Sequence, residues 1–252
     1  MVKIYGLIGS NKKNGTCYSL VIELIKLIER IFSIKGIEVI YKIDYVCDFN
    51  IKECKGCCNC FKNGKCMIND DMANIKKNIL ESDLLIIASP VYLNQITGTL
   101  KKVLDRIAYW THLMPLIGKR GIIITNSSFS GNKESTDYLE LILNHLGVSV
   151  DYVFKYKGNG LNKNQQHYNK KELLVYSNIF QNLDFKIDKR VTQIFDTYSK
   201  WYSQLIKENV DIDSNNELIF WNKNYLGKSI DVVHKKNIQN LKKRYKKNEY
   251  KK

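Results

Sequence analysis

The sequence has no long hydrophobic run. Nowhere do about 18 uncharged apolar residues follow one another, which is close to the minimum for a membrane-spanning helix. Residues 1–9 also contain no apolar stretch with a cleavage site behind it. Disorder is disfavoured, because 44% of the residues are hydrophobic and 11% are aromatic, enough to bury a core. We therefore expect a folded, soluble, cytoplasmic protein without a membrane partner.

Acidic residues are in short supply. Asp and Glu number 25 against 40 Lys and Arg, a net charge of +15. Residues 231–252 carry nine Lys and Arg against two acids, or +7, which leaves +8 for residues 1–230. A basic balance can indicate nucleic acid, anionic lipid or anionic substrates. No helix-turn-helix pattern or aromatic-interleaved basic motif accompanies the basic end, so we expect a solvated helix end and no nucleic-acid partner.

The seven cysteines do not suit a disulfide framework. An odd number, bunched in one place within an intracellular chain, favours metal or redox chemistry over disulfides. Cys17 and Cys47 stand apart. The other five lie within thirteen residues and are Cys54, Cys57, Cys58, Cys60 and Cys66.

Hydrophobic periodicity predicts strands alternating with helices over residues 2–154. Apolar, β-rich runs predict strands at 2–9, 37–43, 84–88, 121–125 and 148–154. Helical spacing predicts helices at 17–32, 70–80, 97–109 and 133–146, and later at 172–183 and 191–206. This alternation indicates an open parallel sheet, and right-handed crossovers then place helices on both faces.

Three loops that follow predicted strands have the composition of a ligand site, and ligands of open α/β sheets bind at that edge. The loop 10–16 offers hydroxyls, amides and lysines at a helix start, where free N–H groups favour a phosphate. It lacks Gly-x-Gly-x-x-Gly and the Gly-Lys-Ser/Thr ending of a nucleotide P-loop. A phosphate that needs no magnesium, such as that of a flavin mononucleotide, is therefore favoured. An ordinary capped helix start is the alternative.

The two other loops can complete such a site. Pro90 and Tyr92 follow a strand directly, where a ring and backbone amides can pack on a flat heterocycle and bond its edge. A buried structural tyrosine is an equal alternative. Small side chains at 125–132 can close the far side of the cleft. His112 and His145 lie in predicted helices, where a packed or surface role is favoured over catalysis, and the sequence identifies no catalytic residue.

The cysteine-rich loop, residues 47–66, is the most specific feature. The spacing Cys54-x2-Cys57-x2-Cys60-x5-Cys66 is similar to compact iron–sulfur sites, in which successive thiolates reach one cluster. It differs from the bacterial ferredoxin pattern in the five residues before the last cysteine and in the absence of a following proline. Structural zinc and metal-free thiols that support an active site remain alternatives.

Five motifs occur in a recognisable order. They are Gly9-Ser10 through Asn14-Gly15-Thr16, Cys54 to Cys60, Gly64-Lys65-Cys66 running into Asp70-Asp71-Met72, Ser89-Pro90-Val91-Tyr92, and Leu100-Lys101 to Asp105-Arg106. This order resembles the flavodoxin-like NAD(P)H-dependent FMN reductase family, and the cysteine spacing resembles the iron–sulfur flavoproteins of anaerobes. The resemblance implies a flavodoxin-like FMN-binding domain over 1–185, with an open parallel five-stranded sheet in the order 2-1-3-4-5. A helical, basic C-terminal extension would follow over 186–252.

The resemblance also implies site residues. Those implied to bind FMN are Ser10, Lys12, Asn14, Gly15, Thr16, Ser89, Pro90, Val91, Tyr92, Leu93, Asn94 and Ser127. Those implied to hold a [4Fe–4S] cluster are Cys54, Cys57, Cys60 and Cys66, which leaves Cys58 over. Lys12 stands where an arginine is common, so a bidentate grip on phosphate would become a point-charge contact.

The implied activity is flavin chemistry. Electrons from NAD(P)H, from a cluster or from ferredoxin would pass through FMN to a small acceptor such as a quinone, nitro compound, disulfide or oxygen species. The alternative is a flavodoxin-type electron carrier, or an iron–sulfur flavoprotein without a dedicated small substrate; true flavodoxins are typically acidic, which this chain is not. The resemblance further implies a homodimer or homotetramer with flavin sites near subunit interfaces.

Overall fold

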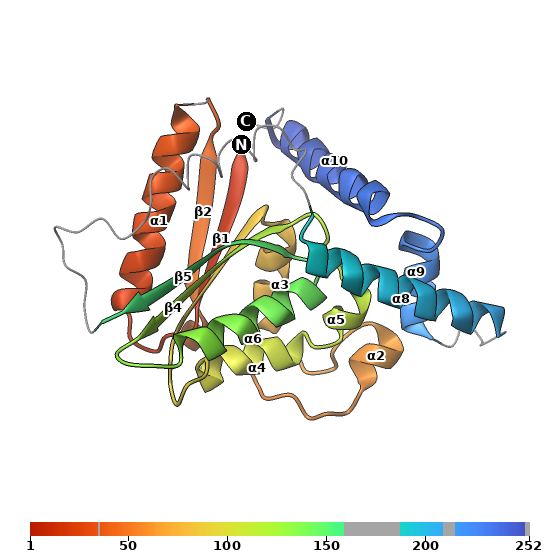
Figure 1. The fold of residues 1–252 in the computed structure, drawn as a ribbon, viewed down its shortest axis with the longest axis horizontal. Coiled ribbons are helices and arrows are strands. Elements are labelled where there is room, and N and C mark those ends of the chain that lie inside the picture. Colours follow the sequence, from red (N-terminus) through yellow and green to blue (C-terminus); the bar gives the residue numbers. More distant parts are fainter. Residues whose placement is uncertain (35, 159–186, 209–214, 250–252) are drawn as a thin grey trace.

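A five-stranded parallel sheet forms the centre of the molecule (Figure 1). It is seen in a computed structural model that describes residues 1–34, 36–158, 187–208 and 215–249. The strands are β1 (Val2–Ile8), β2 (Val39–Tyr45), β3 (Leu84–Pro90), β4 (Arg120–Ser127) and β5 (Ser149–Lys157). Their order is β2-β1-β3-β4-β5 with parallel pairing throughout, which confirms the predicted flavodoxin-like sheet.

Helices cover both faces of the sheet, as right-handed crossovers require. One face is covered by α1 (Thr16–Ser33), and the other by α3 (Met72–Glu81), α4 (Gly98–Arg106) and α6 (Asn132–His145) (Figure 1). Shorter elements lie between them: η1 (Val46–Asp48), α2 (Asn59–Asn63) and α5 (Trp110–Leu113). The C-terminal part contains α8 (Lys189–Lys207), α9 (Asn216–Asn224) and α10 (Ile230–Glu249).

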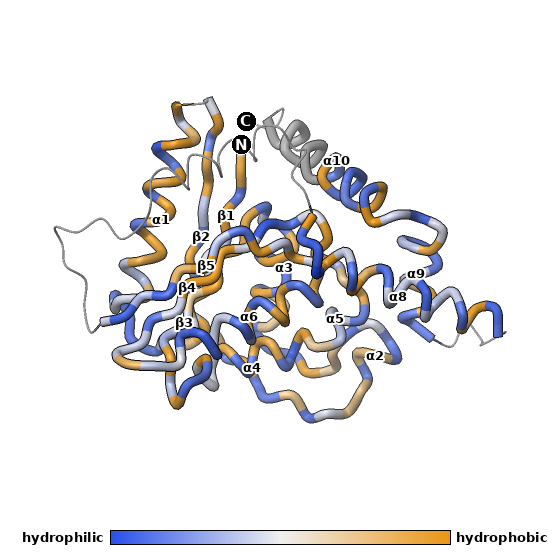
Figure 2. The backbone as a smooth tube through the Cα atoms, viewed as in Figure 1, coloured by the Kyte–Doolittle hydropathy of each residue, from blue (hydrophilic) through white to orange (hydrophobic). Residues whose placement is uncertain are grey.

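The sheet separates two hydrophobic cores. On one side the apolar stripe of α1, including Leu20, Leu24 and Ile28, packs against alternate residues of the strands such as Ile86 and Ile124. Each fully buried side chain of this kind contributes about 1.5–3 kcal/mol. The second core lies under α3, α4 and α6. Hydrophobic positions accordingly gather on the central strands and on the helix faces turned toward them (Figure 2).

The C-terminal helices build a third, aromatic core around Trp221, whose side chain is fully buried. The ring of Trp221 stacks on that of Tyr202 with centroids 4.9 Å apart. Its indole N–H donates to the carbonyl of His112 over 2.8 Å, and the hydroxyl of Tyr225 donates to that of Met114 over 2.9 Å. The aromatic core therefore holds the extension against α5. The predicted helix 172–183 and the domain boundary at 185 lie outside the described residues.

Element ends differ from the predictions in a consistent way. Ser89, Pro90 and Ser127 were expected in loops but lie at the ends of β3 and β4, because strand pairing continues through Ser89–Thr125, Pro90–Asn126 and Ser127–Lys157. A proline is tolerated at a strand end, where its missing N–H costs little. The predicted helix 97–109 ends at Arg106, and α5 follows separately. In the described ranges, no helix is long and apolar enough to cross a bilayer.

Candidate functional site

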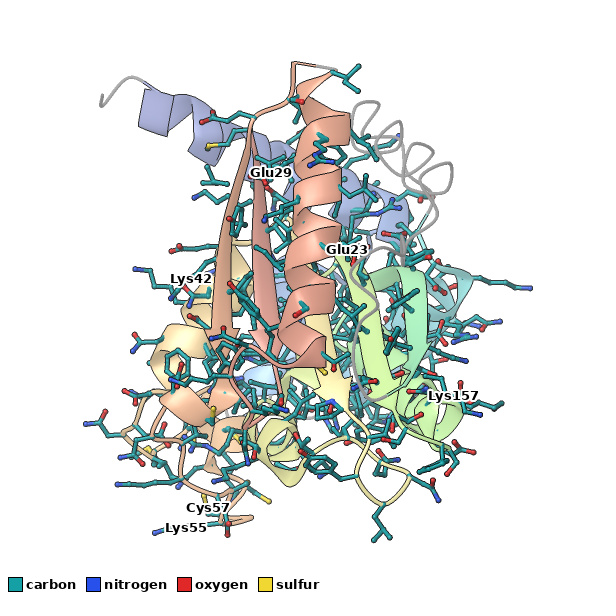
Figure 3. The ribbon with its side chains drawn as sticks, turned by 90° about the vertical axis from the view of Figure 1, so that its left-hand side faces the viewer. Glu23, Glu29, Lys42, Lys55, Cys57 and Lys157 are labelled. Atoms are coloured by element: carbon teal, nitrogen blue, oxygen red, sulfur yellow. The ribbon has the colours of Figure 1, made fainter. Side chains whose placement is uncertain are left out.

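The candidate site lies where the parallel strands end, at the lower edge of Figure 3. Lys157 marks the end of β5 in that view. Cys57 and Lys55 of the cysteine-rich loop project outward from the same edge, away from Glu29 on α1. Two loop systems, one around the ends of β1, β3 and β4 and one carrying the cysteines, therefore share this end of the molecule.

The loop between β1 and α1 presents bare helix amides. Gly15 is the N-cap residue of α1, no side chain caps the helix, and its first turn contains no acidic residue. The predicted residues Lys12 and Asn14 are exposed, whereas Ser10 is buried and its hydroxyl accepts a hydrogen bond from the N–H of Lys12 over 3.1 Å. Ser10 thus shapes the loop. Uncapped amides next to a lysine fit a phosphate group.

The end of β2 braces this loop, which the sequence analysis did not foresee. The backbone N–H of Asn14 donates to the hydroxyl of Tyr45 over 2.9 Å, and Asn14 itself adopts a φ of 53°. Tyr45 stacks on Tyr18 of α1 with ring centroids 5.8 Å apart. Lys13 and Asp48 form an ion pair of 2.6 Å. These contacts hold the loop in one shape before a ligand binds.

The segment after β3 makes a tight, projecting turn. The N–H and carbonyl of Tyr92 both bond to Gln95, at 2.8 and 3.0 Å, and both residues between them have positive φ: 49° at Leu93 and 58° at Asn94. Positive φ at two central residues is the geometry of a type I′ turn. Tyr92 is largely exposed, and Leu93 is fully so. The alternative of a buried structural tyrosine is therefore excluded, because the turn carries this side chain away from the core.

The loop after β4 closes against this turn. Gly131 has a φ of +85°, and a Cβ there would lie 2.6 Å from both the Cα of Asn94 and the Cγ1 of Val91. Such distances are impossible for a side chain, so only glycine fits. The hydroxyl of Ser130 donates to the Oδ1 of Asn94 over 3.0 Å. The two loops are thus in direct contact through Gly131, which the sequence analysis did not single out, and that they line one ligand site stays a prediction.

Three polar atoms at the end of β4 have no hydrogen-bond partner among the described residues. They are the Oγ1 of Thr125, the Oδ1 of Asn126 and the Oγ of Ser127, and all three are buried. Successive side chains of a strand point to opposite faces, so Thr125 and Ser127 lie on one face of the sheet and Asn126 on the other. Leaving a buried polar group unpaired costs about 1–3 kcal/mol, which makes unpaired oxygens at a strand end candidates for contact with a ligand. Together with the uncapped α1, they fit a molecule with a phosphate and a polar flat ring. The assignment of single residues to FMN stays a prediction.

Thr97 ties the two sides of this site together. Its hydroxyl donates to the carbonyl of Gly9 over 2.6 Å and accepts from the N–H of Leu100 over 3.2 Å, which caps α4. Its own N–H donates to the hydroxyl of Ser89 over 3.2 Å. At Gly9 a Cβ would lie 2.7 Å from that of Leu100, so the first strand and α4 are in close contact. Ser89, predicted to bind a ligand, is thereby occupied in holding the turn.

The cysteines are free thiols on an open loop. Cys54, Cys57 and Cys58 are exposed, and Cys60 and Cys66 are half-buried. Within the described chain no three His, Cys, Asp or Glu side chains are gathered closely enough to hold a metal. The donor set itself, four thiols on one short loop, suits an iron–sulfur cluster or zinc in its chemistry. Cluster binding at Cys54, Cys57, Cys60 and Cys66 stays a prediction.

Cationic and aromatic groups surround the half-buried thiols. The ammonium of Lys76 lies 5.1 Å from the ring centroid of Tyr109 and 6.0 Å from that of Trp110. Burial lowers the pKa of Lys76, and the nearby Cys66 and Cys60 thiols act in the opposite direction. Burial raises the pKa of Cys60. Burial at this place therefore favours the neutral forms of the Lys76 amine and the Cys60 thiol.

The base of the cysteine-rich loop is closed by a buried ion pair. Arg106 and Asp70 have side chains only 1% exposed, and their shortest contact is 2.5 Å. Both residues belong to motifs that the sequence analysis quoted without assigning them a role.

His112 contacts Glu217, with Nδ1 3.0 Å from Oε1, and meets the ring of Phe61 edge-on. His112 lies in the short helix α5, just beyond the predicted helix 97–109, and His145 ends α6, within the predicted helix 133–146.

Comparisons with known proteins place this arrangement in context. The model of the family described as NADPH-dependent FMN reductase matches residues 2–151. An iron–sulfur flavoprotein of Archaeoglobus fulgidus is 31% identical over 148 residues, which are 58% of this chain and 64% of that protein. An iron–sulfur flavoprotein of Methanocaldococcus jannaschii is 31% identical over 138 residues, covering 54% of this chain and 67% of that protein. The chain thus spans about two thirds of each of these relatives.

A solved structure shares the fold over a longer stretch. RosB, with 8-demethyl-8-formylriboflavin-5′-phosphate bound, superposes with a TM-score of 0.58, 84% coverage of this chain and 88% of its own. Sequence identity is 15%, so this likeness concerns the fold.

Proposed function

Because this chain belongs to the NADPH-dependent FMN reductase family, we propose that it is an FMN-dependent oxidoreductase. It passes electrons from NAD(P)H, or from a reduced iron–sulfur donor, to a small acceptor such as a quinone, nitro compound or oxygen species. The observation that carries the proposal is the uncapped first turn of α1, at the same edge of the sheet as the unpartnered oxygens at the end of β4. When bound, FMN supplies the hydride and electron chemistry.

The residues of the chain divide the work of binding. The amides of the first turn of α1 and the ammonium of Lys12 hold the phosphate. The turn 91–94 and the loop 127–131, which touch at Gly131, together line the ring site, and the unpaired oxygens at the end of β4 are candidates to accept hydrogen bonds there. Because these loops are locked by Gly131 and Thr97, the site is shaped before binding and loses little conformational freedom.

Exposed apolar side chains at the rim of the site are consistent with the proposed homodimer or homotetramer. Leu93 is fully exposed and Phe129 is 83% exposed, and both belong to the loops that would flank the ring. A second subunit covering these two side chains would remove apolar surface from water and exclude water from the ring.

The cysteine-rich loop is proposed to hold a [4Fe–4S] cluster through Cys54, Cys57, Cys60 and Cys66. Support comes from the donor chemistry and from relatives named iron–sulfur flavoproteins. Four lysines on or beside the loop, Lys52, Lys55, Lys62 and Lys65, suit the docking of an acidic electron donor such as a ferredoxin. If electrons enter through the cluster from a protein donor, the second candidate function applies, which is an iron–sulfur flavoprotein without a dedicated small substrate.

Anaerobic purification followed by absorption spectroscopy tests the proposal. We expect a yellow protein that releases FMN, and bleaching of the flavin by NADPH or NADH with reoxidation by a quinone. Iron and sulfide near four per chain would support the cluster. A colourless protein that fails to bind added FMN contradicts the proposed function. A flavin bleached by reduced ferredoxin alone favours the electron carrier.

A further inference from the structure

One buried side chain joins both ends of the cysteine-rich loop. Arg106, on α4, is 2% exposed. Its Nη1 donates to the carbonyl of Lys52, two residues before Cys54, over 2.7 Å. Its Nη2 lies 3.4 Å from the carbonyl of Ile68, two residues after Cys66. The same two nitrogens bind Asp70 in a bidentate pair at 2.5 and 3.1 Å. The two ends of the loop thus meet at one guanidinium.

Asp70 completes this junction, which we call the neck. Besides the two bonds from Arg106, its carboxylate accepts from the N–H of Lys52 over 2.9 Å and from that of Met72 over 3.1 Å. Four donors saturate a carboxylate. Asp71 adds a bond from the N–H of Asn50 over 2.8 Å. Apart from an interaction of the Cys66 thiol with Arg106, the hydrogen bonds given for residues 53–67 run within the loop itself, so the neck fixes its entry and exit.

One N–H donor of Arg106 is not used in the neck. Its Nε is buried and has no hydrogen-bond partner among the described residues. Burial would lower the pKa of Arg106, but Asp70 and the neighbouring Cys66 thiol raise it, so that sulfur belongs to the surroundings of the guanidinium. A buried donor left unpaired costs about 1–3 kcal/mol. A thiolate of the loop is the acceptor that would satisfy it.

We propose that Arg106 and Asp70 are the positioning residues of the cysteine site: they hold the neck of the loop closed, and the Nε–H of Arg106 is reserved for the sulfur of Cys66 when that cysteine ligates a metal. The inference rests on the proposed metal site at the four cysteines. Groups that orient metal ligands from outside the coordination shell change metal affinity by about 10- to 100-fold when removed. Closing the neck also reduces the chain entropy that metal binding must overcome.

Cobalt binding to metal-free, FMN-loaded protein under anaerobic conditions tests the inference. Co²⁺ alone is the probe, because its thiolate charge-transfer absorption reports sulfur ligation without any turnover. We expect Arg106→Lys, which keeps the charge but loses Nε and the fork, to bind Co²⁺ about 10- to 100-fold more weakly than wild type. The charge-transfer intensity per bound cobalt should also fall. Asp70→Asn should weaken binding in the same direction.

Matched controls come from the same helix. Lys101 and Asp105 form an exposed ion pair on α4, so Lys101→Met and Asp105→Asn should leave cobalt affinity unchanged. Retained FMN and an unchanged circular dichroism spectrum show that the variants are folded. Should Arg106→Lys fail to fold, the double variant Asp70→Asn with Arg106→Gln removes both buried charges together and leaves neither unpaired, and it should show the same loss.

Two outcomes separate the inference from its premise. If wild-type protein binds Co²⁺ and the Co²⁺ affinities of Arg106→Lys and Asp70→Asn lie within two-fold of the wild-type value, the positioning role is overturned. The metal site is then unaffected. Wild-type protein that binds neither Co²⁺ nor iron overturns the metal site, and the positioning role with it.

Discussion

The two loop systems at the edge of the sheet differ in how completely they are formed. Around the ends of β1, β3 and β4, each loop is tied to another by a short contact, such as the 2.6 Å bond from Thr97 to Gly9 or the close approach at Gly131. The cysteine-rich loop is tied at its neck and also touches α5 and α9 through α2, but four of its six thiols are exposed. One system is preformed, and the other still has to close.

The difference reflects what each system would bind. A flat ring and a phosphate are recognised by fixed donors and acceptors, so a rigid site costs least on binding. A cluster is enclosed by its own ligands, and loops of this kind usually gain their final shape from the metal. We therefore expect single substitutions around the ends of β1, β3 and β4 to lower the affinity for FMN by degrees. Single substitutions of cluster ligands in the cysteine-rich loop should abolish binding of the cluster.

The largest expected effect comes from one exposed thiol. Cys57→Ser should abolish iron incorporation while FMN binding stays unchanged, because a cluster needs each of its thiolates and the flavin loops share no contact with this side chain. Iron and sulfide analysis with FMN release measures both. Cys58→Ser is the matched control, since the adjacent thiol is equally exposed but left over by the spacing, and it should retain the iron. Equal iron loss in both variants would contradict the ligand assignment.

Gly131→Val should weaken FMN binding by about 10- to 100-fold, through a strain of the size expected for a β-branched residue at positive φ. The added side chain collides with Asn94 and Val91 and separates the two loops. Isothermal titration with FMN gives the ratio. Gly98→Ala provides the control, because a Cβ there meets nothing within 4 Å. A Gly131 variant with normal FMN affinity would place the flavin elsewhere.

Acid should open the neck at a pH below the ordinary pKa of an aspartate. Burial alone would raise the pKa of Asp70, but Arg106 and the N–H groups of Lys52 and Met72 lower it. The carboxylate therefore stabilises the neck above its unfolded pKa of about 3.9, and that stability is lost as pH falls through the lower folded value. The protection factor of the Lys52 amide proton should stay constant from pH 7 to about 4 and then fall, by up to about ten-fold for each pH unit between the unfolded and the folded pKa of Asp70. Asp70→Asn should show no such transition.

The smallest effect tests the phosphate loop. Lys12→Arg should tighten FMN binding about two- to five-fold, because a guanidinium can grip a phosphate with two hydrogen bonds where an ammonium offers a point charge. Lys13→Arg is the control, since Lys13 is engaged by Asp48 at 2.6 Å. Fluorescence titration of the flavin resolves the difference. Identical gains in both variants would indicate a general charge effect.

Local patterns account for much of the fold. The burial of Leu84 to Ala88 on both faces and the stripe of α1 follow from apolar runs and helical spacing, and both predictions are confirmed. Element ends were less predictable: Ser89 and Ser127 are polar, yet pairing with the neighbouring strand extends both strands to include them. Pairing is a property of two segments far apart in the chain, so no local pattern reports it.

The site shows the same division. The glycine at position 131 resembles any loop glycine in the sequence, and its contact with Asn94 exists only because two strand ends meet. Arg106 and Asp70 stood in quoted motifs, but 36 residues separate them, and nothing in either motif says that they pair.

The amino-acid sequence by itself determined the alternation of strands and helices and the thiol spacing, because alternation and spacing are short-range properties that the chain carries wherever it folds, whereas the strand order came from the family resemblance. The tertiary structure decided which loops touch, which polar atoms are left unpaired and which arginine closes the cysteine-rich loop. Those features depend on distances between residues far apart in sequence, and only packing brings such residues together.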